Sequence, residues 1–413
     1  LALVLALCMV FALCACGQSA APAATEAPAA AEEPAAEAPA EETPAEETEY
    51  KVAMITDYGD ITDQSFNQTT YEACKAFAED NGIEFNYFKP AGDSTADRVA
   101  MIEKAVDEGY NVIVMPGYAF GGAIVEAAPE FPEVKFIALD VAKGDLLETA
   151  VANAGETYDY NPDNWDFEQY VDMSNVYCAI YQEELCGYMA GYAAVKLGYK
   201  NLGFLGGMAV PAVTRYGYGF VQGVDAAAAE LGLTDVTLNY VYGGQFKGDA
   251  DITAVMDTWY SNGTEVVFAC GGGIYVSACE AAQKVGGKVI GVDVDQSGII
   301  DGAYGEGMTV TSAMKGLYPA TYDTLTDVII NGNWANYVGK IENLGLVSGD
   351  DPEANYVQIP MTTQFEDGKF TADDYKALVA SMFDGTITVS NDTSKAASDF
   401  ATVITVNDQG SIK

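Results

Sequence analysis

The stretch KVAMITDYGDITDQSFNQ, residues 51–68, carries the strongest indication of fold in this chain. An apolar, β-branched run ends at Thr56, and Asp57 opens a polar, glycine-containing loop that leads into a helix-like segment ending near Asn81. Open α/β sheets bind ligands where a buried strand ends in such a loop. The loop offers carboxylates, amides and one aromatic ring. These groups suit a neutral, hydroxyl-rich ligand with a flat base better than a phosphate, which favours Lys, Arg or backbone amides.

The same alternation of strand and helix is repeated along the chain in two sets of similar length. The first set has expected strands near 51–56, 84–88, 111–115 and 135–139, and helices near 64–81, 95–108 and 119–128. The second has strands near 201–205, 236–242, 265–270 and 288–292, and helices near 213–231, 249–261 and 275–285. Two more strand-like segments, 308–314 and 339–347, flank a helix near 317–331. Repeated β-α-β units predict parallel sheets with helices on both faces, here as two lobes with a cleft between them.

Polar or glycine-rich residues follow the expected strands in both sets. In the first set they are Asp57, 116–118 and Asp140; in the second they are 206–207, 271–273 and Asp293, and Lys315 follows a later strand. Because the carboxyl ends of parallel strands meet at one edge of a sheet, both lobes are expected to present these residues to one cleft.

The first 49 residues indicate export and anchoring. Residues 1–15 form an uncharged apolar run too short to span a bilayer comfortably, which is typical of a signal peptide. Leu13, Ala15 and Cys16 resemble a bacterial lipobox, so lipid attachment at Cys16 is expected; an ordinary signal peptide cut after Ala15, or an uncut anchor, is the alternative. Residues 16–49, rich in Ala, Pro and Glu, are expected to be a disordered tether that holds the folded part at the outer face of the cell membrane.

The composition excludes several classes of function. A net charge of −42 argues against nucleic acid as a partner. Because the chain has no His, catalysis by a histidine base and metal binding through histidine are both excluded. Five cysteines lie beyond the leader, at 74, 178, 186, 270 and 279; their odd number and lack of CxxC spacing predict core residues, although a Cys178–Cys186 pair stays open. The segment from Asp293 begins like an EF-hand calcium loop, but Tyr304 stands at position twelve, where such a loop has a Glu ligand. No metal or other cofactor is therefore expected.

Seven stretches together resemble the basic membrane protein family of substrate-binding lipoproteins, which includes purine-nucleoside-binding proteins of ABC importers. They are TDYGDITDQSFNQ (56–68), FIALD (136–140), EELCGYMAGYAA (183–194), GFLGGMAVPAVTRYGYGFVQGV (203–224), FACGGG (268–273), VIGVDVDQ (289–296) and SAMK (312–315). The resemblance implies a type I periplasmic binding protein: two Rossmann-like lobes joined by a three-stranded hinge. Lobe 1 is expected to comprise 50–177 and about 305–340, and lobe 2 to comprise 178–304 and about 341–413.

The resemblance also implies a ligand site. Phe66 matches one ring of an aromatic sandwich around a base, and Tyr216 falls where the family has the opposing ring. Asp57 and Asp140 match carboxylates that bind the base, with Asn67 as a further polar contact. The remaining matches concern the sugar: Asp293 binds ribose hydroxyls, Lys315 lies beside it, and the backbone of Gly271 and Gly272 is close.

These expectations converge on an extracytoplasmic lipoprotein that delivers a nucleoside, preferably a purine, to separate permease and ATPase subunits. A sugar or other metabolite, or a sensing role without transport, is the alternative. A metal-dependent nucleosidase is disfavoured because the carboxylates are scattered over both lobes and no His is present. Residues 141–174 exceed the family's usual length and are interpreted as a solvated insertion, with a lid or partner-facing loop as the alternative.

Overall fold

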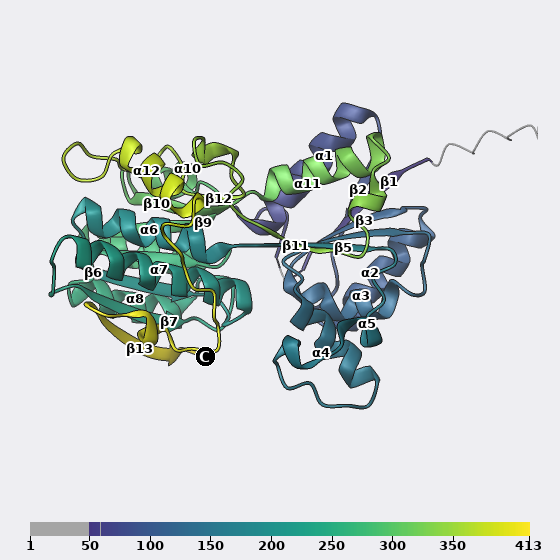
Figure 1. The fold of residues 1–413 in the computed structure, drawn as a ribbon, viewed down its shortest axis with the longest axis horizontal. Helices are drawn as coiled ribbons and strands as arrows, with labels where there is room; N and C mark the ends of the chain where they lie inside the picture. Colours follow the sequence, from purple (N-terminus) through teal and green to yellow (C-terminus); the bar gives the residue numbers. More distant parts are fainter. Residues whose placement is uncertain (1–48, 58) are drawn as a thin grey trace, which may run out of the picture. The chain divides into compact units, whose positions relative to one another are not determined.

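The computed structural model describes residues 49–57 and 59–413 of the 413-residue chain. Residues 49–413 form one compact unit that contains two β-sheets flanked by helices (Figure 1). The predicted signal peptide, the tether up to residue 48 and the lipidation site Cys16 lie outside the described residues. Within the described range, no helix has the length and apolar character needed to cross a membrane.

Lobe 1 is built on a six-stranded parallel sheet in the order β11-β5-β4-β3-β1-β2. Its central strands are buried on both faces, which explains their nearly continuous apolar sequences. The strands are β1 (Lys51–Ile55), β2 (Glu84–Phe88), β3 (Val112–Pro116), β4 (Lys135–Leu139), β5 (Val176–Tyr181) and β11 (Ile341–Leu344). The helices are α1 (Phe66–Asn81), α2 (Thr95–Asp107), α3 (Gly121–Ala127), α4 (Lys143–Asn153), α5 (Phe167–Tyr170) and α11 (Leu317–Leu325), and α11 packs beside α1 (Figure 1).

Lobe 2 has a seven-stranded sheet in the order β12-β10-β9-β8-β6-β7-β13. All neighbours are parallel except β10 and β12. The strands are β6 (Asn201–Gly206), β7 (Thr237–Tyr242), β8 (Val266–Cys270), β9 (Lys288–Asp293), β10 (Thr309–Lys315), β12 (Val357–Gln358) and β13 (Thr405–Ser411). The helices are α6 (Glu183–Leu197), α7 (Pro211–Glu230), α8 (Ala250–Ser261), α9 (Tyr275–Val285), α10 (Ser297–Tyr304) and α12 (Ala372–Phe383).

The chain crosses between the lobes three times, after β5, after β10 and after β11. The prediction of two α/β lobes with parallel sheets is confirmed. The expected lobe boundaries differ from the observed pairing in three places, because β5 and β11 belong to the lobe 1 sheet and β10 belongs to the lobe 2 sheet. The expected division at 177/178, 304/305 and 340/341 is therefore corrected to points close to 182, 316 and 345. A segment belongs to the lobe with whose sheet its strand pairs, and this pairing cannot be read from the order of elements in the sequence.

The interpretation of residues 141–174 as a solvated insertion is wrong for their first part, which packs in the lobe 1 core, whereas most of residues 152–170 are exposed. Helix α4 buries Leu146, Leu147, Ala150 and Val151 and supplies the crossover between β4 and β5. Further along, Trp165 contacts Tyr158 and Tyr170 edge-on or tilted. The five described cysteines are buried and free, so no Cys178–Cys186 bond is present among them.

Glycines fix the closest helix pair of lobe 2. A Cβ added at Gly187 or Gly191 of α6 would lie 2.3 or 2.4 Å from a backbone oxygen of α7, and one at Gly219 or Gly223 of α7 would lie 2.0 or 2.1 Å from one of α6. Because the members of each pair are four residues apart, they share one helix face. The two backbones therefore touch, and this contact brings the start of α6 beside residues 215–216 of α7, where both helices reach the cleft.

Candidate functional site

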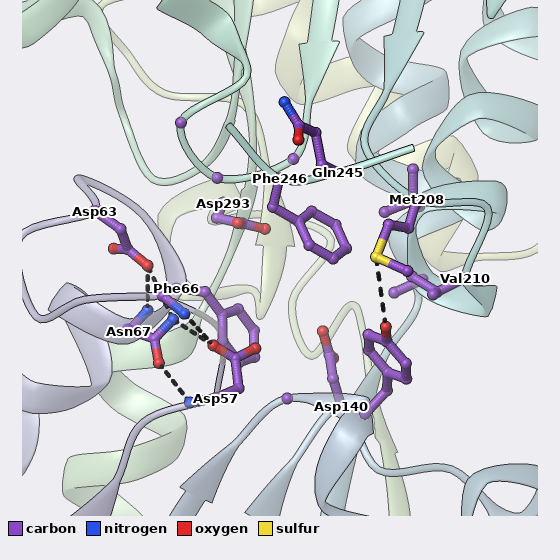
Figure 2. Close-up of a pocket in the computed structure, with 18 of the residues that line it drawn as sticks. Asp57, Asp63, Phe66, Asn67, Asp140, Met208, Val210, Gln245, Phe246 and Asp293 are labelled. Atoms are coloured by element: carbon purple, nitrogen blue, oxygen red, sulfur yellow. Dashed lines mark hydrogen bonds between the residues drawn. The ribbon is translucent and has the colours of Figure 1, made fainter. Parts of the chain in front are cut away.

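A cavity of about 890 Å³ lies between the lobes at the carboxyl ends of their strands (Figure 2). Its volume is in the range of small-molecule sites, roughly 300–1,000 Å³. All nine ligand-binding residues expected from the sequence line it: Asp57, Phe66, Asn67, Asp140, Tyr216, Gly271, Gly272, Asp293 and Lys315. Tyr118, which the sequence placed at the cleft edge, also lines the cavity, and sequence reasoning missed other lining residues, including Met208, Arg215, Gln245 and Phe246.

The lobe 1 wall is held by a local network of side chains. The Asn67 amide nitrogen donates to Asp57 (2.8 Å) and to Asp63 (3.0 Å), and the backbone N–H of Asp57 donates to the Asn67 oxygen (3.2 Å). Asp63 also accepts the backbone N–H groups of Ser65, Asn67 and Gln68, so it caps the start of α1. Burial raises the pKa of Asp57 and of Asp63, against the lowering effect of these hydrogen bonds. This network fixes Phe66, the first residue of α1, at the cavity wall.

Lys315 is the charged centre of the cleft. Only 5 % exposed, it pairs with Asp140 of lobe 1, while its Nζ lies 3.2 Å from Glu183 and 4.0 Å from Asp293. Burial alone would lower the pKa of Lys315, but the three carboxylates outweigh burial and raise it, so the ammonium stays charged. Burial also raises the pKa of Asp140 to about 6, with Lys315 acting in the opposite direction.

Glu183 and Arg215 extend this ion network, and neither was predicted as a site residue. Arg215 Nε donates to Glu183 at 2.6 Å, and Glu183 is fully buried. Burial raises the pKa of the neighbouring Glu184 to about 7. The signal in the sequence was the presence of these charges at the starts of two otherwise apolar, glycine-containing helices, where an unpaired charge would be costly.

Asp140 and Asp293 occupy corresponding places in the two lobes. Asp140 follows β4 and Asp293 ends β9, and each has a left-handed backbone, with φ of 59° and 65°. Non-glycine residues rarely adopt this conformation, and it concentrates at functional sites. Both oxygens of Asp293 accept hydroxyl hydrogen bonds, from Ser65 of lobe 1 at 2.6 Å and from Tyr216 at 3.2 Å. The Asp140 Oδ1 atom has no hydrogen-bond partner among the residues that the structure describes.

Tyr216 does not present an open ring face to the cleft. It is 2 % exposed, packs edge-on against Phe268 and directs its hydroxyl to Asp293. Instead, the ring of Phe246, on the loop after β7, points into the space between Phe66, Asp140 and Met208 (Figure 2). Phe246 is therefore the lobe 2 ring that points into the cavity, and Tyr216 donates its hydroxyl to Asp293; stacking of Tyr216 on a base stays a prediction. The sequence register around 216 offered several aromatic residues, and only the tertiary structure shows which ring reaches the cavity.

Glycines at two strand ends make room for Phe246. A Cβ at Gly207 would lie 2.6 Å from the Phe246 ring, and a Cβ at Gly271 would lie 3.0 Å from it. Gly272 has a φ of +50°, and its Cβ would lie 3.0 Å from the Phe246 carbonyl oxygen. Gly271 and Gly272 therefore line the cavity and also form the surface on which the ring rests.

Two lobes with parallel sheets, three crossings and a cavity lined by aromatic rings and carboxylates at the strand ends define a solute-binding protein of the type I periplasmic class. The comparison with known proteins agrees. Residues 50–350 match the sequence pattern of the Bmp family, described as ABC transporter substrate-binding proteins that are PnrA-like. The chain belongs to this family; it is a substrate-binding protein and not an enzyme.

Several curated proteins are similar to this chain. The nucleoside-binding protein BmpA of an ABC transporter from Lactococcus lactis is 26% identical over 261 residues, covering 60% of this chain and 65% of that protein, just under two thirds of its length. Basic membrane protein B of Borreliella burgdorferi is 25% identical over 323 residues, covering 76% of this chain and 82% of that protein.

Solved structures support the fold. An ABC transporter solute-binding protein from Aeropyrum pernix aligns with a TM-score of 0.58 at 20% identity, covering 85% of this chain and 90% of its own. A solute-binding protein from Conexibacter woesei aligns with a TM-score of 0.57 at 20% identity. The alignment covers 83% of this chain and 99% of that protein. At this identity the likeness concerns the fold alone.

Proposed function

We propose that this protein binds a nucleoside, with a purine base preferred, in the cleft between its lobes and delivers it to the permease and ATPase of an ABC importer. The observation that carries the proposal is the pairing of two aromatic rings, Phe66 from lobe 1 and Phe246 from lobe 2, in a cavity with buried carboxylates. A base stacked on an aromatic side chain gains about 1–3 kcal/mol. The name of the Lactococcus lactis relative points to the same class of ligand.

The polar groups of the cleft suit the edges of a base and the hydroxyls of a sugar. Asp140 Oδ1 is a buried acceptor without a partner among the described residues, and Asp57 is held in place by Asn67. We assign both carboxylates to N–H donors of the base. We assign Asp293, Lys315 and the Gly271–Gly272 backbone to the ribose. A ligand that lacks these donors would leave buried carboxylates unpaired, which is the usual basis of strong discrimination.

The charge balance of the cleft disfavours a phosphorylated ligand. The lining includes seven aspartates against four cations. Three of these cations are engaged: Lys315 with Asp140, Arg215 with Glu183 and Lys89 with Asp60. A nucleotide phosphate would therefore meet repulsion that a neutral nucleoside avoids.

The test is calorimetric titration of residues 49–413 with inosine, guanosine, adenosine, cytidine, ribose, glucose and guanosine monophosphate. The proposal expects purine nucleosides to bind more tightly than cytidine, and free sugars or the nucleotide to bind weakly. Chromatography of the mixture should return the nucleoside intact. Binding of glucose or ribose without any nucleoside binding would replace this proposal by a sugar-binding function.

We further propose that lipid on Cys16 holds the protein on the extracytoplasmic face of the cell membrane. The lipobox-like sequence supports this proposal, and a relative from Pyrococcus abyssi, 25% identical over 308 residues, is named a lipoprotein. Labelling with radioactive palmitate should mark the wild type and Cys14→Ala but not Cys16→Ala. Equal labelling of Cys16→Ala would contradict the assignment.

A further inference from the structure

The loop between β7 and α8 forms part of the lobe 2 wall of the cleft. This loop, residues 243–249 (GGQFKGD), carries Gln245 and Phe246 at the cavity wall and contains three glycines. Glycine permits many backbone conformations, so such a segment does not fix a ring by local preference alone. Backbone hydrogen bonds from Gly243 and Gly244 to residues 206 and 207, and between the loop and Gly273, hold its inner side.

The outer side of the loop is held by residues 405–413. Strand β13 runs parallel to β7 at the edge of the lobe 2 sheet, and beyond it the backbone N–H of Ile412 donates to the Tyr242 oxygen at 2.8 Å (Figure 1). Residue 413 then lies on the loop. A Cβ added at Gly244, where φ is +78°, would be 3.0 Å from Lys413 Cβ.

The Lys413 side chain reaches the other end of the same loop. Its Nζ pairs with Asp249 Oδ2 and lies 3.9 Å from Asp251. The same Asp249 oxygen accepts the Gln245 amide at 2.7 Å, while Oδ1 caps α8 through the N–H groups of residues 251 and 252. Lys413, Asp249 and Gln245 thus form a short chain of contacts from the sheet edge to the residue next to Phe246.

We propose that residues 405–413, termed the strap, hold the 243–249 loop in the shape that presents Phe246 to the ligand, and that Lys413 is the positioning residue of the strap. The strap lies beyond residues 50–350, the part that matches the family pattern. Its start has a separate anchor, because Asp225 of α7 accepts the backbone N–H groups of residues 402–404. Loosening the end of the strap therefore does not require release of its start. The effect on ligand affinity rests on the proposed function, whereas the effect on the loop does not.

The first measurement is hydrogen exchange of the 243–249 amides in the ligand-free full chain. Lys413→Ala should speed exchange there about two- to fivefold, which is the size expected for a partly exposed ion pair, and deletion of 405–413 should speed it more. Lys413→Arg should restore the wild-type rate. Lys369→Ala is the matched control, since it removes another lobe 2 lysine that pairs with a carboxylate outside the cleft, Glu366. Unchanged exchange in both Lys413→Ala and the deletion would overturn the proposal.

The second measurement is nucleoside affinity in the same variants. Lys413→Ala should weaken binding by about the same two- to fivefold factor and Lys413→Arg should not. Trp259 Nε1 donates to Gln409 of β13 at 3.2 Å, so a change in tryptophan emission that is lost in a Trp259→Phe background shows whether the strap is still docked. Nucleoside binding that is insensitive to Lys413→Ala would remove the positioning role and leave the proposed function intact. Faster loop exchange in a protein that binds no nucleoside would support the strap and refute the proposed function.

Discussion

Lobe 1 and lobe 2 place equivalent groups in the cleft by different means. Each contributes an aspartate with a left-handed backbone at the end of a strand, Asp140 or Asp293, and each lines the cavity with aromatic residues, among them Phe66 in lobe 1 and Phe246 in lobe 2. In lobe 1 the ring of Phe66 is fixed by neighbours in sequence, through the network of Asp57 and Asn67. In lobe 2 the ring of Phe246 rests on glycines from two other strand ends, about 40 and 25 residues away. The lobe 1 wall is therefore locally encoded, whereas the lobe 2 wall depends on long-range packing.

Removing Lys315 should have the largest effect, because both lobes share this cation. Lys315→Met leaves Asp140, Glu183 and Asp293 without their buried counter-charge, so the free energy of unfolding should fall by about 3–5 kcal/mol at pH 7.5. Urea denaturation of the wild type and the variant measures this difference in the free energy of unfolding. Lys340→Met, which breaks the exposed pair with Glu342, should change stability by no more than about 1 kcal/mol. Equal effects of the two variants would show that the cleft ions do not stabilise the fold.

Lowering the pH should stabilise both lobes through buried carboxyl groups. Burial raises the pKa of Asp140 to about 6 and that of Asp145 and Glu184 to about 7, whereas unfolded carboxyls titrate near pH 4. Between these values the folded state binds more protons, so the free energy of unfolding decreases as pH rises. From pH 5 to 7.5 the loss should be roughly 1–3 kcal/mol for each carboxyl with a pKa near 7.

Two variants divide this pH dependence between the lobes. Asp145→Asn should remove the part of the lobe 1 share that Asp145 carries, leaving that of Asp140, and Glu184→Gln should remove the part that Glu184 carries in lobe 2; urea unfolding at several pH values measures each. Glu306→Gln, which removes an exposed carboxylate, is the control. Stability that rises from pH 5 to 7.5 in the wild type would contradict the sign of these shifts.

The two rings should contribute similarly to nucleoside binding despite their different supports. Phe66→Ala and Phe246→Ala should each weaken binding of the preferred purine nucleoside by about 1–3 kcal/mol in calorimetric titration, because each removes one stacking face. Gly207→Ala should lower affinity in the same direction, because its Cβ would displace the Phe246 ring. Full affinity of Phe246→Ala would show that the base does not stack on this ring and would favour Tyr216 as the lobe 2 ring that contacts the base.

Tyr216→Phe should have the smallest effect. It keeps the ring in the core and removes only the hydroxyl that donates to Asp293 at 3.2 Å. Nucleoside affinity should fall by about 0.5–1.5 kcal/mol, the usual value of one hydrogen bond. If Tyr216→Phe keeps its affinity while Phe246→Ala loses it, the base stacks on Phe246 and the Tyr216 hydroxyl only orients Asp293.

The sequence predicted the elements of the fold better than their assembly. Strands such as 111–115 and 265–270 were recognised because continuous apolar runs are typical of parallel strands buried on both faces. The assignment of β5, β10 and β11 to lobes was wrong, because three crossings leave no mark in local sequence. The first part of the segment 141–174 was misread because its polar surface residues conceal the buried face of α4.

The amino-acid sequence alone determined that two α/β lobes form and that polar residues follow their strands, since periodicity and strand-end chemistry are local properties. It also placed Asp57, Phe66 and Asn67 together, because they lie within eleven residues of one another. Only the tertiary structure showed that the Phe246 ring points into the cavity, and that Glu183 and Arg215 join the ions around Lys315. These choices depend on which backbones pack closely enough, through Gly187, Gly219 and Gly207, to bring distant side chains into one cavity.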